Sequence, residues 1–218
     1  MKWFPLVGLL VAWVGGEAQA QDAAVGVGAR ASNFEAGGEF DVRLRWDRGY
    51  QLGLTLRGAR TFETFVGGFA EDDGASFEAI AHGILPLAQR DGFEVGLRTG
   101  LGVRQLLVDE AQGPDDSATR WSLDTGPIVA LHLGEAFTLR LGWTLLFELE
   151  LTPTTDVADL GQRITIGGLV SLGGGVSVYA DVGALGTFGF SGDNGKFIFD
   201  GSLGLRWVFG GNPNWRLF

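Results

Sequence analysis

Large apolar side chains occupy every second position of the stretch FTLRLGWTLLFELEL, which runs from Phe137 to Leu151. A period of two is typical of an extended strand, because successive side chains point to opposite faces. The intervening positions hold mostly Thr, Arg, Gly and Glu, so one face of this strand is apolar and the other is polar. Either a protein core or lipid must cover the apolar face, and the rest of the chain distinguishes the two.

The same alternation recurs between turn signals along the whole chain and predicts ten strands. The strands are expected at residues 23–32, 39–47, 50–60, 76–87, 92–107, 119–133, 137–151, 163–172, 176–189 and 196–209. Short connections are expected at 47–49, 89–92, 134–136 and 173–175, and longer ones at 33–38, 61–75, 109–118, 152–162 and 191–195. Short and long connections alternate, as do the periplasmic turns and outer loops of outer-membrane barrels. Eight strands would result if 33–38 were misassigned, and twelve if the long loops held a further pair.

Aromatic residues gather at both ends of the apolar faces, whereas Leu, Val, Ala and Ile fill the middle. Beside the short turns lie Trp46, Tyr50, Phe93, Phe137, Trp207 and Phe209, and toward the long connections lie Phe40, Phe77, Trp121, Phe147, Phe188 and Phe197. Two aromatic girdles flanking an aliphatic band are the lipid-facing pattern of a membrane barrel. The pattern therefore favours an all-β, antiparallel transmembrane barrel with its apolar rows outward. Pro127 interrupts the sixth strand, and we expect a bulge there because proline lacks a ladder donor.

Nearly all charges of the predicted strands fall on the opposite face, which would line the lumen. This predicted lumen charge network comprises Arg43, Arg57, Glu94, Arg98, Arg104, Asp124, Arg140, Glu148, Asp181, Asp200 and Arg206. Both signs occur at each depth, and an unpaired buried charge is unfavourable, so we expect these charges to pair and obstruct the lumen. Arg98 is expected to pair with Asp181 at similar depth, with Gly96 and Gly100 leaving room for its side chain.

The N-terminus has the pattern of a cleaved secretory signal peptide. Lys2 precedes an apolar run, and the segment ends on the small residues Ala18 and Ala20. The run is too short to cross a bilayer as a helix. We therefore divide the chain into a signal peptide at 1–20, a transmembrane barrel at 21–210 and a tail at 211–218.

Composition excludes several functions. The 218 residues include no Cys, which removes disulfides and thiolate metal sites. The net charge of −10 disfavours binding to nucleic acid, whose phosphates would be repelled. We expect no cofactor and no metal, and the acidic loops offer at most divalent-ion contacts shared with lipopolysaccharide.

The signal-peptide pattern, the alternation and the aromatic-ended last strand GLRWVF, from Gly204 to Phe209, resemble those of a bacterial outer-membrane β-barrel of the small OmpA/OmpX-like class. No motif narrows the resemblance to one family within that class. The resemblance implies a monomer in the outer membrane of a Gram-negative cell, in contact with lipid and lipopolysaccharide and inserted by the barrel-assembly machinery. The tail GGNPNWRLF continues past this strand, so either Phe209 or Phe218 is the end that this machinery would recognise.

Several functions fit this architecture: a structural or weakly pore-forming barrel with a charge-plugged lumen, an outer-membrane enzyme, or a surface binding and adhesion barrel. A soluble exported β-sandwich would alternate as well. The enzyme hypothesis rests on a resemblance to outer-membrane proteases, phospholipases and lipid A modifiers, whose sites combine His with Asp, Ser or Glu. His82 and His132 lie near short turns, whereas the acidic pairs at 72–73 and 115–116 lie in long loops at the opposite end. Because proton transfer needs hydrogen-bond reach, we predict a non-catalytic barrel that is structural or weakly pore-forming.

Overall fold

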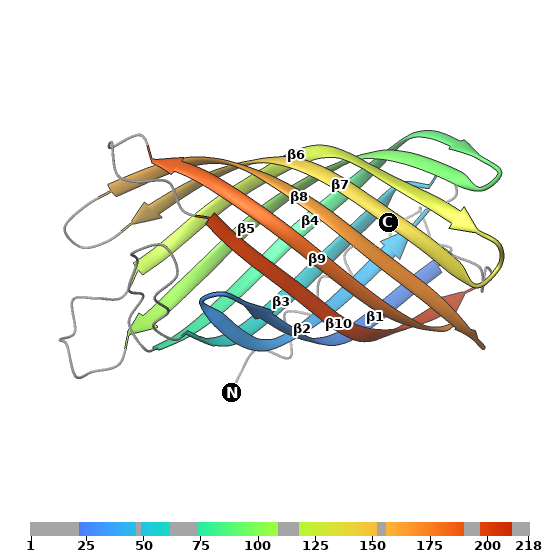
Figure 1. Cartoon of the computed structure of the whole chain (residues 1–218), viewed down its shortest axis with the longest axis horizontal. Coiled ribbons are helices and arrows are strands. Elements are labelled where there is room, and N and C mark those ends of the chain that lie inside the picture. Colours follow the sequence, from blue (N-terminus) through green and yellow to red (C-terminus); the bar gives the residue numbers. More distant parts are fainter. Residues whose placement is uncertain are drawn as a thin grey trace.

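Ten antiparallel strands close into a single barrel in the computed structural model of the chain (Figure 1). The structure describes residues 22–46, 49–61, 74–108, 118–151, 156–189 and 197–210. The strands are β1 (Asp22–Ser32), β2 (Glu35–Arg45), β3 (Gln51–Thr61), β4 (Gly74–Arg90), β5 (Phe93–Val108), β6 (Ala118–Leu133), β7 (Phe137–Leu151), β8 (Asp156–Gly173), β9 (Val176–Gly189) and β10 (Phe197–Gly210). Each strand pairs with its sequence neighbours, and β1 pairs with β10 to close the barrel. The predicted all-β class and the ten-strand count are confirmed.

The predicted signal peptide at 1–20 and tail at 211–218 lie outside the described residues, as does Phe218. Phe209 lies near the end of β10, with its side chain exposed. The part of the chain that the structure describes contains no helix long and apolar enough to span a membrane.

Glycine forms the short turns at one end of the barrel. Gly92 has a φ of 79° and Gly134 a φ of 74°, and the three glycines at 173–175 all have positive φ. Left-handed backbone is strained for residues with a Cβ, so glycine is favoured at these positions. The short connections predicted at 89–92, 134–136 and 173–175 are therefore confirmed.

Two predicted long connections are wrong in extent. Only Asn33 and Phe34 separate β1 from β2, although 33–38 was expected to be a connection. Likewise β8 begins at Asp156, within the expected connection 152–162. Gly37 and Gly38 are weak strand formers by themselves, but β2 is hydrogen-bonded to its sequence neighbours β1 and β3 on both sides at these residues. Pairing on two sides, which the local pattern does not encode, extends the strand.

The bulge expected at Pro127 is also wrong. Within the described strands, the pairing of β6 with β5 and β7 keeps one register on both sides of Pro127. The ladder to β7 merely lacks pairs at Gly126 and Pro127, so the missing proline donor is tolerated without an extra residue. The register shifts instead between Pro86 and Ala88 of β4, and again near the end of β8, in both cases beside a short turn.

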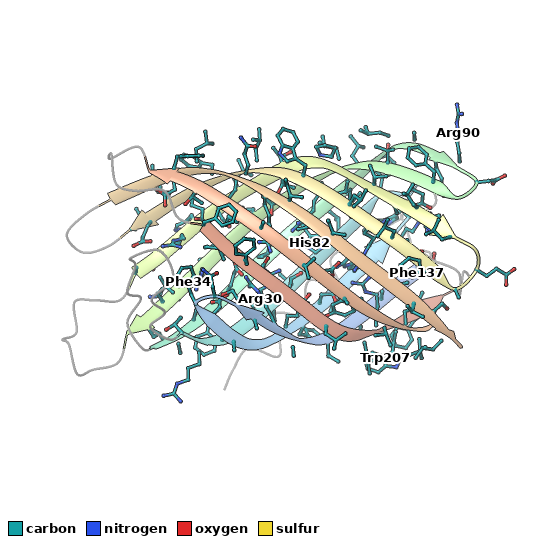
Figure 2. All side chains as sticks on the ribbon, in the orientation of Figure 1. Arg30, Phe34, His82, Arg90, Phe137 and Trp207 are labelled. Atoms are coloured by element: carbon teal, nitrogen blue, oxygen red, sulfur yellow. The ribbon has the colours of Figure 1, made fainter. Side chains whose placement is uncertain are left out.

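The apolar rows point outward, away from the lumen (Figure 2). Leu141, Ile166 and Val182 are direct neighbours across β7, β8 and β9, and all three are exposed. Among the residues predicted for the girdles, Tyr50, Trp121, Phe147, Phe188 and Phe209 are exposed, and Trp46, Phe93, Phe137 and Trp207 are partly exposed. A continuous exposed belt of large apolar side chains is the surface that a bilayer covers.

The barrel wall has unequal height around the lumen. Strands β1, β2 and β3 have 11 residues each, whereas β4 has 17 and β8 has 18. In Figure 1 the blue β1–β2 hairpin accordingly ends short of the green and yellow strands, at the end of the barrel that carries the long connections. The β1–β2 turn therefore ends below the rim formed by the longer strands. Phe34 in this turn lines the lumen cavity and is only 4% exposed.

Candidate functional site in the barrel lumen

A cavity of about 250 Å³ occupies the lumen, and charged side chains dominate its lining. The structure brings all but one member of the predicted lumen charge network to its wall: Arg43, Arg57, Arg98, Arg104, Asp124, Arg140, Glu148, Asp181, Asp200 and Arg206. Glu94 lies nearer the short turns, where its Oε1 accepts a hydrogen bond of 3.1 Å from Gln89 and lies 3.4 Å from Nε2 of His132.

Several charged lumen residues were not predicted: Arg30, Glu35, Glu39, Arg120 and Arg163. Alternation with Ala29 and Ala31 could have placed Arg30 on the polar face. Glu35 fell in an expected loop, whereas it belongs to β2. These omissions matter because Arg30 and Glu35 are central to the largest ion-pair network.

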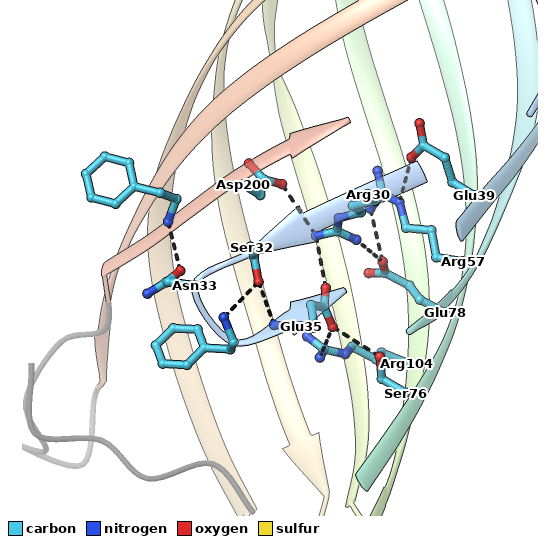
Figure 3. Close-up of polar contacts among 12 residues, drawn as sticks. Arg30, Ser32, Asn33, Glu35, Glu39, Arg57, Ser76, Glu78, Arg104 and Asp200 are labelled. Carbon is cyan, nitrogen blue, oxygen red and sulfur yellow. Dashed lines mark hydrogen bonds and ion pairs between the residues drawn. The ribbon is translucent and has the colours of Figure 1, made fainter. Parts of the chain in front are cut away.

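We name this network the outer cluster, formed by Arg30, Glu35, Arg57, Glu78, Arg104 and Asp200 (Figure 3). Arg30 of β1 is its centre, because its guanidinium lies 3.2 Å from Glu35, 3.5 Å from Glu78 and 3.4 Å from Asp200. Each of these acids has a second cation. Arg104 Nη2 donates to Glu35 at 2.7 Å, Arg57 Nη1 donates to Glu78 at 3.0 Å, and Arg163 pairs with Asp200.

The turn between β1 and β2 holds the outer cluster in place (Figure 3). Ser32 Oγ accepts hydrogen bonds of 3.1 Å from the backbone N–H groups of Phe34 and Glu35. Asn33 fastens the turn to β10, since its side-chain nitrogen donates to the carbonyl oxygen of Phe197 at 3.2 Å and its side-chain oxygen accepts from Phe199 N–H at 3.1 Å. Side chains that satisfy turn backbone in this way fix its conformation, and Glu35 is thereby directed at Arg30 and Arg104.

A second group of charges, the inner cluster, lies in the half of the lumen nearer the short turns. It comprises Asp41, Arg43, Arg140, Asp181 and Arg206. Arg43 Nε donates to Asp41 at 2.6 Å, and Nη2 of Arg140 lies 2.7 and 2.9 Å from the two carboxylate oxygens of Asp181.

The predicted pairing of Arg98 with Asp181 is wrong. Arg98 Nη2 lies 3.4 Å from Asp124 on the adjacent strand β6, whereas Asp181 belongs to Arg140. The predicted partners share a depth but come from β5 and β9, which are not neighbours in the barrel. Register explains the actual pair, because Asp124 lies directly opposite Gly100 and fills the space that this glycine leaves.

Glycines recur opposite large polar side chains in the lumen. The directly paired residues are Gly26 and Asp41, Gly53 and His82, Gly100 and Asp124, Gly167 and Asp181, Gly183 and Asp200, and Gly204 and Tyr179. In each pair, a Cβ at the glycine would overlap or closely crowd the side chain opposite. The polar side chains therefore lie flat over their glycine partners, and the middle of the lumen keeps its cavity.

Both histidine side chains are largely buried in the described barrel. His132 Nδ1 lies 3.0 Å from Thr138 Oγ1 and its Nε2 lies 3.4 Å from Glu94, which resembles a nucleophile, base and acid in series. Thr138 is, however, 0% exposed, so its hydroxyl is closed to solvent. His82 is buried beside the inner cluster. The acidic pairs at 72–73 and 115–116 lie outside the described residues, and within those residues no three acidic or imidazole side chains gather as metal ligands.

Comparisons with known proteins establish the fold and no family. A scan against protein-family models finds no match, and a search of curated proteins finds none either. Among solved structures, the chain is similar to the beta domain of the Bordetella autotransporter BrkA, at 11% identity, with 88% of this chain and 100% of that chain covered and a TM-score of 0.50.

The chain is also similar to the outer membrane protease OmpT from Escherichia coli, at 9% identity, with 88% of this chain and 98% of that chain covered and a TM-score of 0.46. A further similar structure is Ail, the attachment invasion locus protein of Yersinia pestis, at 9% identity, with coverage of 88% and 100% and a TM-score of 0.38. Together with barrel closure, the similarity to the BrkA domain identifies the fold as that of a bacterial outer-membrane β-barrel.

Proposed function

We propose that this protein is a monomeric outer-membrane barrel with a structural role, whose lumen is closed to large solutes and conducts ions weakly. One observation carries the proposal: Arg30 of β1 contacts Glu35 and Asp200 on the adjacent strands β2 and β10 and Glu78 on the non-adjacent strand β4, so that its guanidinium is held inside the lumen. Buried ions are retained where several partners offset their desolvation. A guanidinium with three carboxylates around it is such an arrangement, and it obstructs the path along the lumen.

The proposed location is the outer membrane, where lipid and lipopolysaccharide would cover the exposed apolar belt. Insertion would require the barrel-assembly machinery. We expect the mature protein in the outer-membrane fraction, extractable only with detergent, and with a gel mobility that changes on boiling because a closed barrel resists detergent unfolding. Recovery as a soluble periplasmic protein would contradict the proposal.

Conductance tests the obstruction directly. In planar bilayers, Arg30→Ala should raise single-channel conductance several-fold over the wild type and shift selectivity toward cations, since the substitution removes a central cation while the acids stay. The variant should still fold, because Glu35 and Glu78 retain hydrogen bonds from Arg104 and Arg57 and Asp200 retains its ion pair with Arg163.

Arg60→Ala is the matched control for this experiment. It removes the same charge, but Arg60 is exposed at the end of β3 and does not line the lumen cavity. Its conductance should equal that of the wild type. Large, steady wild-type channels that Arg30→Ala leaves unchanged would show that the lumen is an open pore.

A further inference from the structure

Arg206 of β10 is a buried guanidinium with incomplete partners. Its side chain is 2% exposed, and the one carboxylate within 4 Å among the described residues is Asp41, 3.8 Å from Nη2. Nε and Nη1 have no hydrogen-bond partner within the described part of the chain. The ring of Tyr179 lies 5.1 Å from the guanidinium carbon and covers one of its faces. A cation–π contact stabilises the charge but accepts none of the N–H bonds in the guanidinium plane.

The acids of the inner cluster already have other donors. Asp41 accepts a short hydrogen bond from Arg43, and Asp181 accepts two from Arg140. Asp41 therefore reaches Arg206 only at 3.8 Å, through Nη2. The described acids thus leave Nε and Nη1 of Arg206 unmatched.

The nitrogen atoms without an acceptor belong to residues that line the lumen cavity. All five members of the inner cluster line the cavity of about 250 Å³. Arg140 Nε, like Nε and Nη1 of Arg206, lacks an acceptor among the described residues. Buried guanidinium groups rarely leave donors unmatched, because the desolvation of a charged donor is costly.

We infer that the inner cluster binds one small monovalent anion, such as a halide or a short carboxylate, with Arg206 and Arg140 as its donors. The anion would accept hydrogen bonds from the donors that the described residues leave unmatched, Nε and Nη1 of Arg206 and Nε of Arg140. Charge-assisted hydrogen bonds from guanidinium groups are the strong interactions that hold such anions. The inference rests on the proposed function and deepens it, since it names a ligand for the same lumen. Binding of the anion does not require the barrel to conduct ions.

Anion binding is measured on the folded barrel in detergent, in a gluconate buffer, because gluconate is much bulkier than a halide or formate. Titration calorimetry with sodium bromide and with sodium formate should show one site per chain. Arg206→Gln should weaken binding by about tenfold or more, because it removes the charge and most of the donors. Arg104→Gln removes a lumen arginine of the outer cluster and should leave the affinity within about twofold.

The Asp41→Asn variant tests whether Arg206 binds an anion or only stabilises the barrel. Its carboxylate competes with the anion for Arg206, so its neutralisation should tighten binding by about threefold or more. The same variant decides the question if Arg206→Gln fails to fold. No heat of binding in the wild type, equal affinity in Arg206→Gln, or unchanged affinity in Asp41→Asn would each overturn the site. Calorimetry does not depend on ion conduction. Failure of the anion site would therefore leave the proposed function, which the conductance of Arg30→Ala tests, unaffected.

Discussion

Replacing Leu141 with arginine should lower the free energy of unfolding in liposomes by about 2–4 kcal/mol, the effect of a cation at the centre of the lipid-facing surface. Leu141 lies near the middle of β7 and is 38% exposed on the outside of the barrel. Its cross-strand neighbours Val129 and Ile166 are also apolar, so no acid on this face would pair with the new charge. Denaturant titration of the refolded protein measures the change.

Leu151→Arg is the control for this prediction, because it makes the same substitution on the same face of the same strand. Leu151 ends β7 at the side of the long connections, where the new side chain can reach water. Its effect should stay within about 1 kcal/mol. Equal effects at the two positions would mean that no lipid-like layer covers the middle of the barrel.

Gly126→Ala should lower the free energy of unfolding by about 1–3 kcal/mol, as overpacking does where the backbone must move. A Cβ at Gly126 would overlap the carbonyl oxygen of Trp143 and lie 2.7 Å from Cα of Thr144. Both obstacles belong to the backbone of β7, so a change of rotamer cannot relieve the overlap. The strands would have to separate at the point where Pro127 already interrupts their ladder.

Gly58→Ala is the matched control, since it adds the same methyl group to another strand glycine. The closest atom to a Cβ there is a ring carbon of Phe77 at 3.6 Å, an ordinary contact. Its effect on the free energy of unfolding should stay within about 0.5 kcal/mol. If Gly126→Ala proves equally neutral by denaturant titration, then β6 and β7 do not approach as closely as described.

Pairing in the lumen was the part of the candidate site that could not be predicted. Alternation places Arg98, Asp124 and Asp181 on one face, and the structure brings all three to the cavity wall. Alternation does not predict which of these side chains form ion pairs, because contacts inside a barrel depend on the register of adjacent strands. A Gly opposite a polar residue was the missing signal, as at Gly100 and Asp124, but it can be recognised only once the register is known.

The sequence by itself determined the all-β class, the ten strands and the division of side chains into an apolar and a polar face, because each depends on local alternation and turn residues. Only the tertiary structure decided that β2 starts at Glu35 and that Arg30 lies at the centre of the outer cluster. It also decided that Arg206 lies buried with unmatched donors. The physical reasons are strand pairing and closure: pairing with β1 and β3 extends β2, and joining β1 to β10 brings side chains distant in sequence together in one narrow lumen.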